Sequence, residues 1–242
     1  LAVVEDAAHA LPARYRGRMI GAMCPGFDGP NLVAFSFYAT KNLTTGEGGM
    51  LTGPPDLIDG ARVWSLHGMS RDAFKRYTSE GSWRYEVVLP GFKYNMPDIQ
   101  AAIGLQQLKR LDAMQKRRRD IVSQYDEALG QLDELETPVA RPGVDSAWHI
   151  YLLRLKPGRL KIDRGQFIDA LRQRNIGASV HFIPVHTHPY YRDRYGFQPA
   201  DFPVAQSNFE RMLSLPLSPA HSDADVADVI EAVTDIVRAN RA

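Results

Sequence analysis

Apolar residues recur at helical spacing over a long stretch in the middle of the chain. The stretch begins behind Pro97, which suits the first turn of a helix, and runs until Gly130. The residues that carry the pattern are Ile99, Ile103, Leu105, Leu108, Leu111, Met114, Ile121, Tyr125 and Leu129. Because this spacing marks one face of an α-helix, it predicts a single long helix, which we expect to lead out of one domain and into the next.

Upstream of this helix, two apolar runs are typical of strands. Residues 1–4 form a short apolar run that ends in Glu5 and Asp6, as expected of a buried parallel strand that delivers polar groups at its carboxyl end. Residues 31–38 form the second run. The other elements expected here are a Gly-rich turn at 46–49, a short strand from 50 to 52, a helix at 56–67 and an irregular stretch at 69–92.

Downstream of the long helix, strand and helix patterns alternate, which indicates a small α/β or α+β domain. The elements expected here are a strand at 149–155, a helix at 165–175 that Gly177 stops, a strand at 178–183, a loop rich in His and Pro, and a last helix at 222–240. The fold class expected for the whole chain is α/β, with domains at residues 1–112 and 113–242.

The composition is that of a globular protein and argues against several function classes. With 242 residues, 44% hydrophobic and 24% charged, the chain can bury a full core. A formal net charge of +1 gives no reason to expect nucleic acid, and the basic run at 116–119 favours a solvated helix face. No run of about 18 apolar residues exists, so no membrane span is expected. The single cysteine, Cys24, fits a cytoplasmic location and is interpreted as a buried or incidental thiol.

The first residues have the character of the middle of a buried strand, with no initiator Met and no signal peptide. We therefore expect the beginning of the protein to be missing from this chain. The first strand should then pair with protein absent from the sequence, or leave an apolar face exposed near Leu1, Val3 and Val33. Such a chain by itself should be poorly soluble.

Two segments place chemically useful residues at strand ends. Asp6 comes directly after the first strand, and open α/β sheets bind ligands at the carboxyl ends of their strands. Lys41 follows the second strand beside a Gly-rich turn, where partial desolvation would ease loss of its proton. A neutral amine is the nucleophile that forms a Schiff base with an aldehyde. Taken singly, each residue has a plainer and commoner interpretation, Asp6 as a structural cap and Lys41 as a surface charge.

Six stretches distributed between residues 3 and 230 change this interpretation, and the similarity that they carry extends over nearly the whole chain. They are VVEDAAHA (3–10), FSFYATKNLTTGEGGML (35–51), GFKYNMPDIQAAIGLQQL (91–108), WHIYLLRL (148–155), IGASVHFIPVHTHPYY (176–191) and LSLPLSPAHSDADVADVI (213–230). With them the chain resembles the sugar aminotransferases of the DegT/DnrJ/EryC1/StrS family, a branch of the fold-type I pyridoxal-phosphate enzymes. The resemblance implies an aspartate-aminotransferase-like fold. Residues 1–112 would be the C-terminal half of the large cofactor-binding domain, and residues 113–242 the small domain.

The resemblance also implies roles for individual residues. Lys41 would hold pyridoxal 5′-phosphate as a Schiff base and later shuttle the proton. Asp6 would pair with the pyridine nitrogen and keep it protonated, so that the ring can accept electrons. The other cofactor contacts implied are Ala8 under the ring, His9 at the 3-oxygen of the ring and Ser36 at the phosphate.

Further contacts are implied outside the loops of Asp6 and Lys41. In relatives the segment corresponding to 91–96 reaches across a dimer interface to the cofactor phosphate of the partner, so a homodimer with shared active sites is implied. Many relatives carry Asn where this chain has Lys93, and Arg where it has Asn95. This departure leaves the phosphate ligand open, although Lys93 could supply the charge. The substrate contacts implied are Tyr38, His181, Phe182 and His186.

The reaction implied is transfer of an amino group, from a donor such as glutamate, to a keto sugar linked to a nucleotide. EDAAHA and WH followed by Ile or Leu resemble the branch that aminates 4-keto nucleotide sugars, such as the UDP-4-keto-pentose of lipid A modification. A sugar dehydratase of the same family is one alternative, but such relatives replace the lysine with histidine. An inactive or dimerisation fragment is another.

Two chemistries outside this family are less well supported. The spacing of His181, His186 and His188 is not a standard zinc arrangement and no cysteine supports it, so no metal is expected. A hydrolase triad of Ser36 with His9 and Asp6 lacks the nucleophile elbow of the G-x-S-x-G kind.

Overall fold

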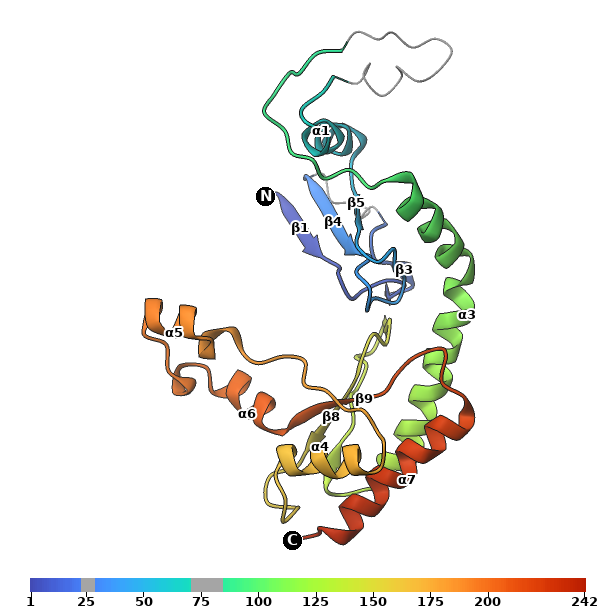
Figure 1. Cartoon of the computed structure of the whole chain (residues 1–242), viewed down its shortest axis with the longest axis vertical. Helices are drawn as coiled ribbons and strands as arrows, with labels where there is room; N and C mark the ends of the chain where they lie inside the picture. Colours follow the sequence, from blue (N-terminus) through green and yellow to red (C-terminus); the bar gives the residue numbers. More distant parts are fainter. Residues whose placement is uncertain (23–28, 71–84) are drawn as a thin grey trace. The chain divides into compact units, whose positions relative to one another are not determined.

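The computed structural model describes residues 1–22, 29–70 and 85–242 (Figure 1). Two sequence predictions concern residues outside these ranges, one wholly and one in part. Cys24 lies outside the described residues, as does most of the irregular stretch expected at 69–92.

The chain divides into two compact units. Unit 1 contains Leu1–Asp112 and Pro142–Ala147, and unit 2 contains Ala113–Arg141 and Trp148–Ala242. The division falls inside one helix of 32 residues, α3 (Asp98–Leu129), which confirms the long helix predicted from the apolar spacing. The assignment of the two units to a large and a small enzyme domain stays a prediction.

Unit 1 is built on a mixed sheet of three strands, in the order β1-β4-β5. Strand β1 (Val3–Asp6) pairs in parallel with β4 (Asn31–Ser36), and β4 pairs antiparallel with β5 (Gly49–Thr52). Helix α1 (Pro55–Ser65) follows β5. A second small sheet has the order β3 (Arg18–Met19), β2 (Arg14–Tyr15), β7 (Val144–Asp145).

The position of β1 corrects one sequence prediction. The parallel pairing is confirmed, but the strand is not buried, because Val4 is 72% exposed and Leu1 is fully exposed. The reason is that β1 is hydrogen-bonded on one side only, at the edge of the sheet. An exposed face near Val33 was also expected, yet this residue is buried because it lies on the central strand β4.

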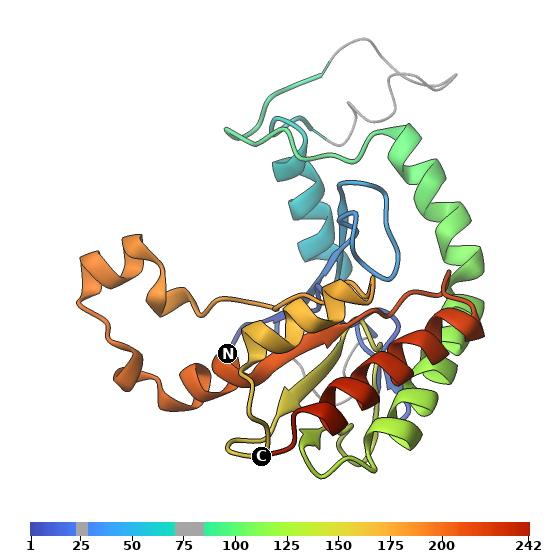
Figure 2. The same ribbon diagram turned by 60° about the horizontal axis from the view of Figure 1, so that its bottom comes forward.

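Unit 2 contains an antiparallel sheet in the order β6-β8-β9. Its elements are the C-terminal half of α3, β6 (Leu135–Glu136), β8 (Tyr151–Leu155), α4 (Arg164–Gln173), the 3-10 turn η1 (Val185–Thr187), α5 (Pro189–Tyr195), the 3-10 turn η2 (Pro199–Asp201), α6 (Pro203–Arg211), β9 (Met212–Leu215) and α7 (Asp223–Ala239). Helices α4 and α7 lie side by side, and the C-terminal half of α3 runs along α7 (Figures 1 and 2).

One contiguous apolar core holds unit 2 together. Strand β8 alternates buried and half-buried residues, as a strand with one face on a core does. Helix α7 buries a stripe at helical spacing. The residues of the core with no exposed surface are Ile121, Tyr125, Leu129, Tyr151, Leu153, Phe167, Leu171, Leu213, Val226, Val233 and Val237.

Capping boxes define where two helices of unit 2 begin. Ser222 accepts a hydrogen bond from the backbone N–H of Asp225, whose carboxylate accepts one from the N–H of Ser222. Asp163 and Gln166 form the same arrangement at α4. The bounds of α7 thus confirm the last helix predicted, because the residues expected at its two ends are its caps.

Two predictions between these helices are wrong. Helix α4 ends at Gln173 and the left-handed residue behind it is Asn175 (φ 61°), so Gly177 does not stop the helix. Residues 178–183 do not form a strand. Ser179 makes one isolated bridge to Ser214, and the chain bends at His181 before Pro184, which has no N–H to continue a ladder.

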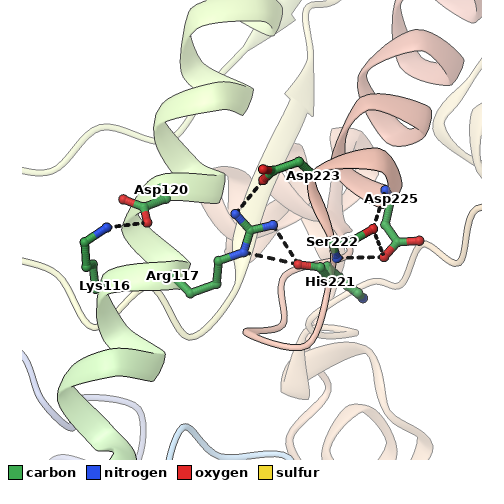
Figure 3. A network of polar contacts seen from close by, with 7 residues as sticks. All are labelled: Lys116, Arg117, Asp120, His221, Ser222, Asp223 and Asp225. Carbon is green, nitrogen blue, oxygen red and sulfur yellow. Dashed lines mark hydrogen bonds and ion pairs between the residues drawn. The ribbon is translucent and has the colours of Figure 1, made fainter.

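The basic run of α3 is solvated only in part. Arg117 donates to the carbonyl of His221 and to Asp223, and so joins α3 to the start of α7 (Figure 3). Arg118 is buried, and its Nη1 donates to the carbonyls of Trp148, at 3.2 Å, and Leu217, at 3.1 Å. The predicted solvated face is therefore wrong for Arg118, because tertiary contacts supply acceptors that the helix itself lacks.

Candidate cofactor site

Asp6 and Ser36 lie at the carboxyl ends of two hydrogen-bonded parallel strands. Asp6 is the last residue of β1 and pairs in register with Ala34 of β4, two residues before Ser36. Because side chains alternate along a strand, Asp6, Ala34 and Ser36 share one face of the sheet. One Asp6 oxygen accepts the N–H of Ala8 at 3.0 Å, and the Ser36 hydroxyl accepts the N–H of Tyr38 at 3.3 Å.

Lys41 belongs to a loop that leaves β4 and returns to β5. Its backbone N–H donates to the carbonyl of Tyr38 at 3.0 Å, which forms a turn directly after Ser36. The carbonyl of Phe37 accepts the N–H of Thr45 at 2.9 Å, and the N–H of Phe37 donates to Gly48 at 2.8 Å. These bonds close residues 37–48 into a compact loop with Lys41 half-buried within it.

The Gly-rich turn beside Lys41 needs glycine for two reasons. Gly46 and Gly48 both have positive φ, at 80° and 150°. A Cβ on Gly48 would also lie 2.4 Å from the Thr45 hydroxyl. The turn predicted at 46–49 is therefore confirmed, and β5 starts at its last residue.

Asn42, next to Lys41, is the main feature that the sequence interpretation missed. Its side chain is 8% exposed. Its amide donates to the carbonyl of Leu11 at 3.1 Å and to that of Ala147 at 2.7 Å. A polar residue directly after the lysine, between a strand and a Gly-rich turn, was the available signal.

The remaining residues proposed for unit 1 lie in two places. Ala8 is half-buried and His9 exposed in the loop that follows β1. Lys93 and Asn95 are exposed, and Lys93 donates to the side chain of Asn95. Their loop is joined to the end of α1, since the N–H of Tyr94 donates to the carbonyl of Ser65 at 2.7 Å.

Three residues expected to contact substrate belong to unit 2. His181 exchanges a hydrogen bond of 2.8 Å with Ser214 and packs edge-on against Phe182, with ring centroids 4.8 Å apart. Phe182 is 66% exposed. His186 is buried and stacks on Phe202, with no partner for its Nε2 among the described residues. Tyr190 and Tyr191 are exposed on α5.

The opposite face of the unit 1 sheet carries an apolar pocket. Phe35 points to the side of β4 away from Ser36, by strand alternation, and Phe37, the first residue after the strand, lines the same cavity. Together with Leu43, Leu105 and Leu108 they line a cavity of about 560 Å³. The polar side chains of Asp6 and Ser36 and the apolar pocket therefore lie on opposite faces of the sheet, and neither polar residue lines the pocket.

Two other kinds of feature, a metal centre and a membrane-spanning helix, are absent from the described residues. No group of three or more His, Cys, Asp or Glu side chains is arranged to hold a metal ion there. No helix of the described residues is long and apolar enough to cross a membrane.

With this geometry in place, comparison with known proteins identifies the family. The profile of the DegT/DnrJ/EryC1/StrS aminotransferase family matches residues 1–234, and the chain belongs to this family. It is 54% identical over 240 residues to the spore coat polysaccharide biosynthesis protein SpsC of Bacillus subtilis. It is 50% identical over 242 residues to the protein MJ1066 of Methanocaldococcus jannaschii.

The alignments cover most of this chain but not most of its relatives. They include 98% of the chain and 60% of SpsC, and 100% of the chain and 61% of MJ1066. The chain therefore spans about three fifths of the length of these relatives.

Solved structures confirm the predicted fold class. The PLP form of Spr1654 from Streptococcus pneumoniae, a putative sugar aminotransferase, superposes with a TM-score of 0.84 at 32% identity, over 98% of this chain and 58% of that one. DesV of S. venezuelae, in complex with a ketimine intermediate, superposes with a TM-score of 0.81 at 32% identity, over the same shares. The fold is aspartate-aminotransferase-like and mixed α/β.

The expected cofactor is confirmed at the level of the family, which depends on pyridoxal 5′-phosphate. The residues present fit this group. A carboxylate suits a protonated ring nitrogen, a hydroxyl suits a phosphate, and an amine suits an aldehyde, and these are the groups of Asp6, Ser36 and Lys41. Asp6 and Ser36 share one sheet face, and Lys41 follows Ser36 by five residues.

Proposed function

We propose that this chain is the part of a pyridoxal-phosphate-dependent aminotransferase that carries the cofactor-binding lysine, Lys41. The whole enzyme would transfer an amino group to a keto sugar linked to a nucleotide. The observation that carries the proposal is the placement of Asp6 and Ser36 on one face of neighbouring parallel strands, with Lys41 in the loop between β4 and β5.

In this proposal the residues of unit 1 have distinct tasks. When bound, pyridoxal 5′-phosphate supplies an electron sink for the bond broken at the amino-bearing carbon. The Asp6 carboxylate holds a proton at the ring nitrogen, the Ser36 hydroxyl binds the phosphate, and Ala8 leaves room under the ring. His9 bonds the ring 3-oxygen. Lys41 would provide the amine that holds the cofactor through its aldehyde, and would take and return the proton.

The proposed substrate is a nucleotide-linked sugar, aminated at a 4-keto position, with glutamate as the amino donor. Two observations support the sugar. The relative SpsC is named for polysaccharide biosynthesis, and the structural neighbours include sugar aminotransferases. The side chains of Tyr38 and Phe182 are exposed and available to contact a ligand. We propose His181 and His186 as further substrate contacts.

The proposed active enzyme is a cytoplasmic homodimer with shared sites. Lys93 and Asn95 are proposed to reach the cofactor phosphate held by a second copy, and both are exposed on the loop beside α1. The product would serve a cell-surface polysaccharide or a lipopolysaccharide. A dehydratase of the same family is less well supported, because Lys41 is present where such relatives carry histidine.

Borohydride trapping tests the central assignment. Borohydride reduces a Schiff base to a stable secondary amine, so treating the protein purified from its natural host should attach the cofactor permanently to one lysine. Peptide mapping by mass spectrometry should find the label on Lys41. A label on another lysine, or none on a protein that contains the cofactor, would refute the proposal. Transfer of ¹⁵N from labelled glutamate to a nucleotide sugar then tests the reaction.

A further inference from the structure

The side chain of Asn42 bonds to two segments that are distant in sequence. Leu11, whose carbonyl accepts one amide hydrogen, lies in the loop that follows Asp6. Ala147, whose carbonyl accepts the other, ends the segment Pro142–Ala147, by which the chain returns to unit 1. One buried amide thus joins the loop of Lys41 to the loop after Asp6 and to the returning segment.

Neither acceptor has a strand ladder to hold it in place. Leu11 lies in a turn and Ala147 in an irregular stretch, both outside named strands. Asn42 is 8% exposed and Ala147 4% exposed, so water is a poor substitute for this amide. The carbonyl of Ala147 and the amide of Asn42 lie 2.7 Å apart, which is a short hydrogen bond for this pair.

The rest of the loop bonds mainly to itself. Thr44 donates to Phe37 and accepts from Gly46, and Thr45 donates to Glu47. These bonds give residues 37–48 their internal shape but do not determine where Lys41 lies relative to Asp6. The bond from Asn42 to Leu11 links the two loops directly.

We propose that Asn42 is a positioning residue for the lysine, an inference that rests on the proposed function. Asp6 is held by β1, and its loop continues to Leu11. By joining Leu11, Asn42 sets the backbone of Lys41 at a fixed distance from the carboxylate that serves the same cofactor. Proton transfer at a bound ring depends steeply on such placement, since a misplacement of about 1 Å can cost 100-fold in rate.

The test compares Asn42→Ala and Asn42→Ser with the matched control Thr52→Val. Thr52 lies opposite Val33 in the sheet and donates to the carbonyl of Gly21 at 3.0 Å, so its variant also removes a hydrogen bond between distant segments of unit 1 but none made by the loop of Lys41. The readouts are kcat and KM, the apparent pKa of the cofactor absorbance, the rate of borohydride trapping on Lys41, and the unfolding temperature of the cofactor-free protein.

Asn42→Ala should lower kcat by about 10- to 100-fold with a smaller change in KM. It should also shift the apparent pKa of the absorbance and slow the trapping. Asn42→Ser, which keeps one donor, should fall between Asn42→Ala and the unchanged protein. Thr52→Val should change only the unfolding temperature.

Two outcomes overturn the proposal alone. In the first, Lys41 is labelled in the unchanged protein while Asn42→Ala keeps its kcat and its absorbance pKa. In the second, neither Asn42 variant accumulates as folded protein, which assigns the two hydrogen bonds to folding. Absence of label on Lys41 in the unchanged protein overturns the proposed function and this role together, so the two failures are distinguishable.

Discussion

Units 1 and 2 differ in how their apolar side chains are buried. Unit 2 has one contiguous core, in which Tyr151, Leu153 and Phe167 have no exposed surface, and most of its exposed apolar residues lie between residues 182 and 204. Unit 1 leaves apolar residues in water at the edge strand β1 and along the start of α3, where Ile99 is 78% exposed. The same helix therefore continues one apolar pattern through two environments, exposed at its start and buried at its end.

This difference shows that periodicity reports a helix face but not what covers it. Ile99 and Ile103 fall on the same pattern as Ile121 and Tyr125, yet the first two are exposed and the last two fully buried. Exposed apolar surface of this extent is unfavourable in water. The C-terminal half of α3 packs into the core of unit 2, whereas the apolar residues at the start of α3 stay largely exposed in this chain.

The largest expected effect is the loss of activity when the proposed cofactor residues of unit 1 are replaced. Lys41→Ala in the whole enzyme should abolish measurable turnover, because alanine provides neither the link to the cofactor nor the proton carrier. Asp6→Asn should keep the link but lower kcat on the order of 100-fold, since an amide cannot hold the ring nitrogen protonated. Steady-state kinetics and the cofactor absorbance check both. Wild-type kcat in Asp6→Asn would make Asp6 a structural cap.

The second effect concerns folding of the separate parts. Residues 113–242 expressed alone should fold cooperatively, because the core of unit 2 lies within them. Residues 1–112 expressed alone should aggregate, because the edge strand β1 and the exposed apolar residues of α3 would associate. Urea unfolding followed by circular dichroism and size-exclusion chromatography checks both fragments. A soluble, folded 1–112 would remove the contrast between the units.

The third effect measures the contrast at single residues. Phe167→Ala should lower the free energy of unfolding of unit 2 by about 3–5 kcal/mol, as expected for a large core side chain. Ile99→Ala in the 242-residue chain should change stability by no more than about 0.5 kcal/mol, since the residue is mostly in water. Denaturant titration gives both values. If Ile99→Ala were costly in the protein from its natural host but not here, further protein must cover Ile99 there.

The smallest effect is a pH dependence confined to unit 2. Burial raises the pKa of Tyr125 and of Tyr151, and the hydrogen bond from Tyr151 to Asp126 at 2.7 Å raises the pKa of Tyr151 further. The unfolded chain ionises these phenols near pH 10, while the folded unit keeps them protonated. Their contribution to stability is therefore complete below pH 10 and is lost as the pH rises toward the raised values.

Arg118 acts in the opposite direction. Burial lowers the pKa of its guanidinium to about 10, so above that pH the folded state gives up a proton that the unfolded state keeps, and stability rises. Two tyrosines against one arginine leave a net loss of stability above pH 10. Tyr151→Phe should make this loss shallower, as measured by urea unfolding of residues 113–242 between pH 9 and 11.5 or so. An unchanged slope would contradict the burial of this phenol.

Local patterns were sufficient for much of this protein. The apolar spacing and the residues at the ends predicted α3 and α7, because a helix is defined by contacts three and four residues apart. The apolar run at the start of the chain predicted that Asp6 lies at the end of a parallel strand, which the structure confirms, whereas Ser36 was implied only by the resemblance to the family. The motif around Lys41 predicted the family, which the comparison confirmed.

Tertiary structure alone decided the rest. Residues 178–183 have strand-forming character, yet only Ser179 finds a partner, Ser214, because pairing depends on a neighbour distant in sequence. The sequence predicted a solvated Arg118, whereas in the folded protein its guanidinium donates to the carbonyls of Trp148 and Leu217. Asn42 binds carbonyls 31 and 105 residues away. The hydrogen-bond partners and the burial of these residues depend on segments that are distant in sequence, and the local spacing of residues does not encode which segments those are.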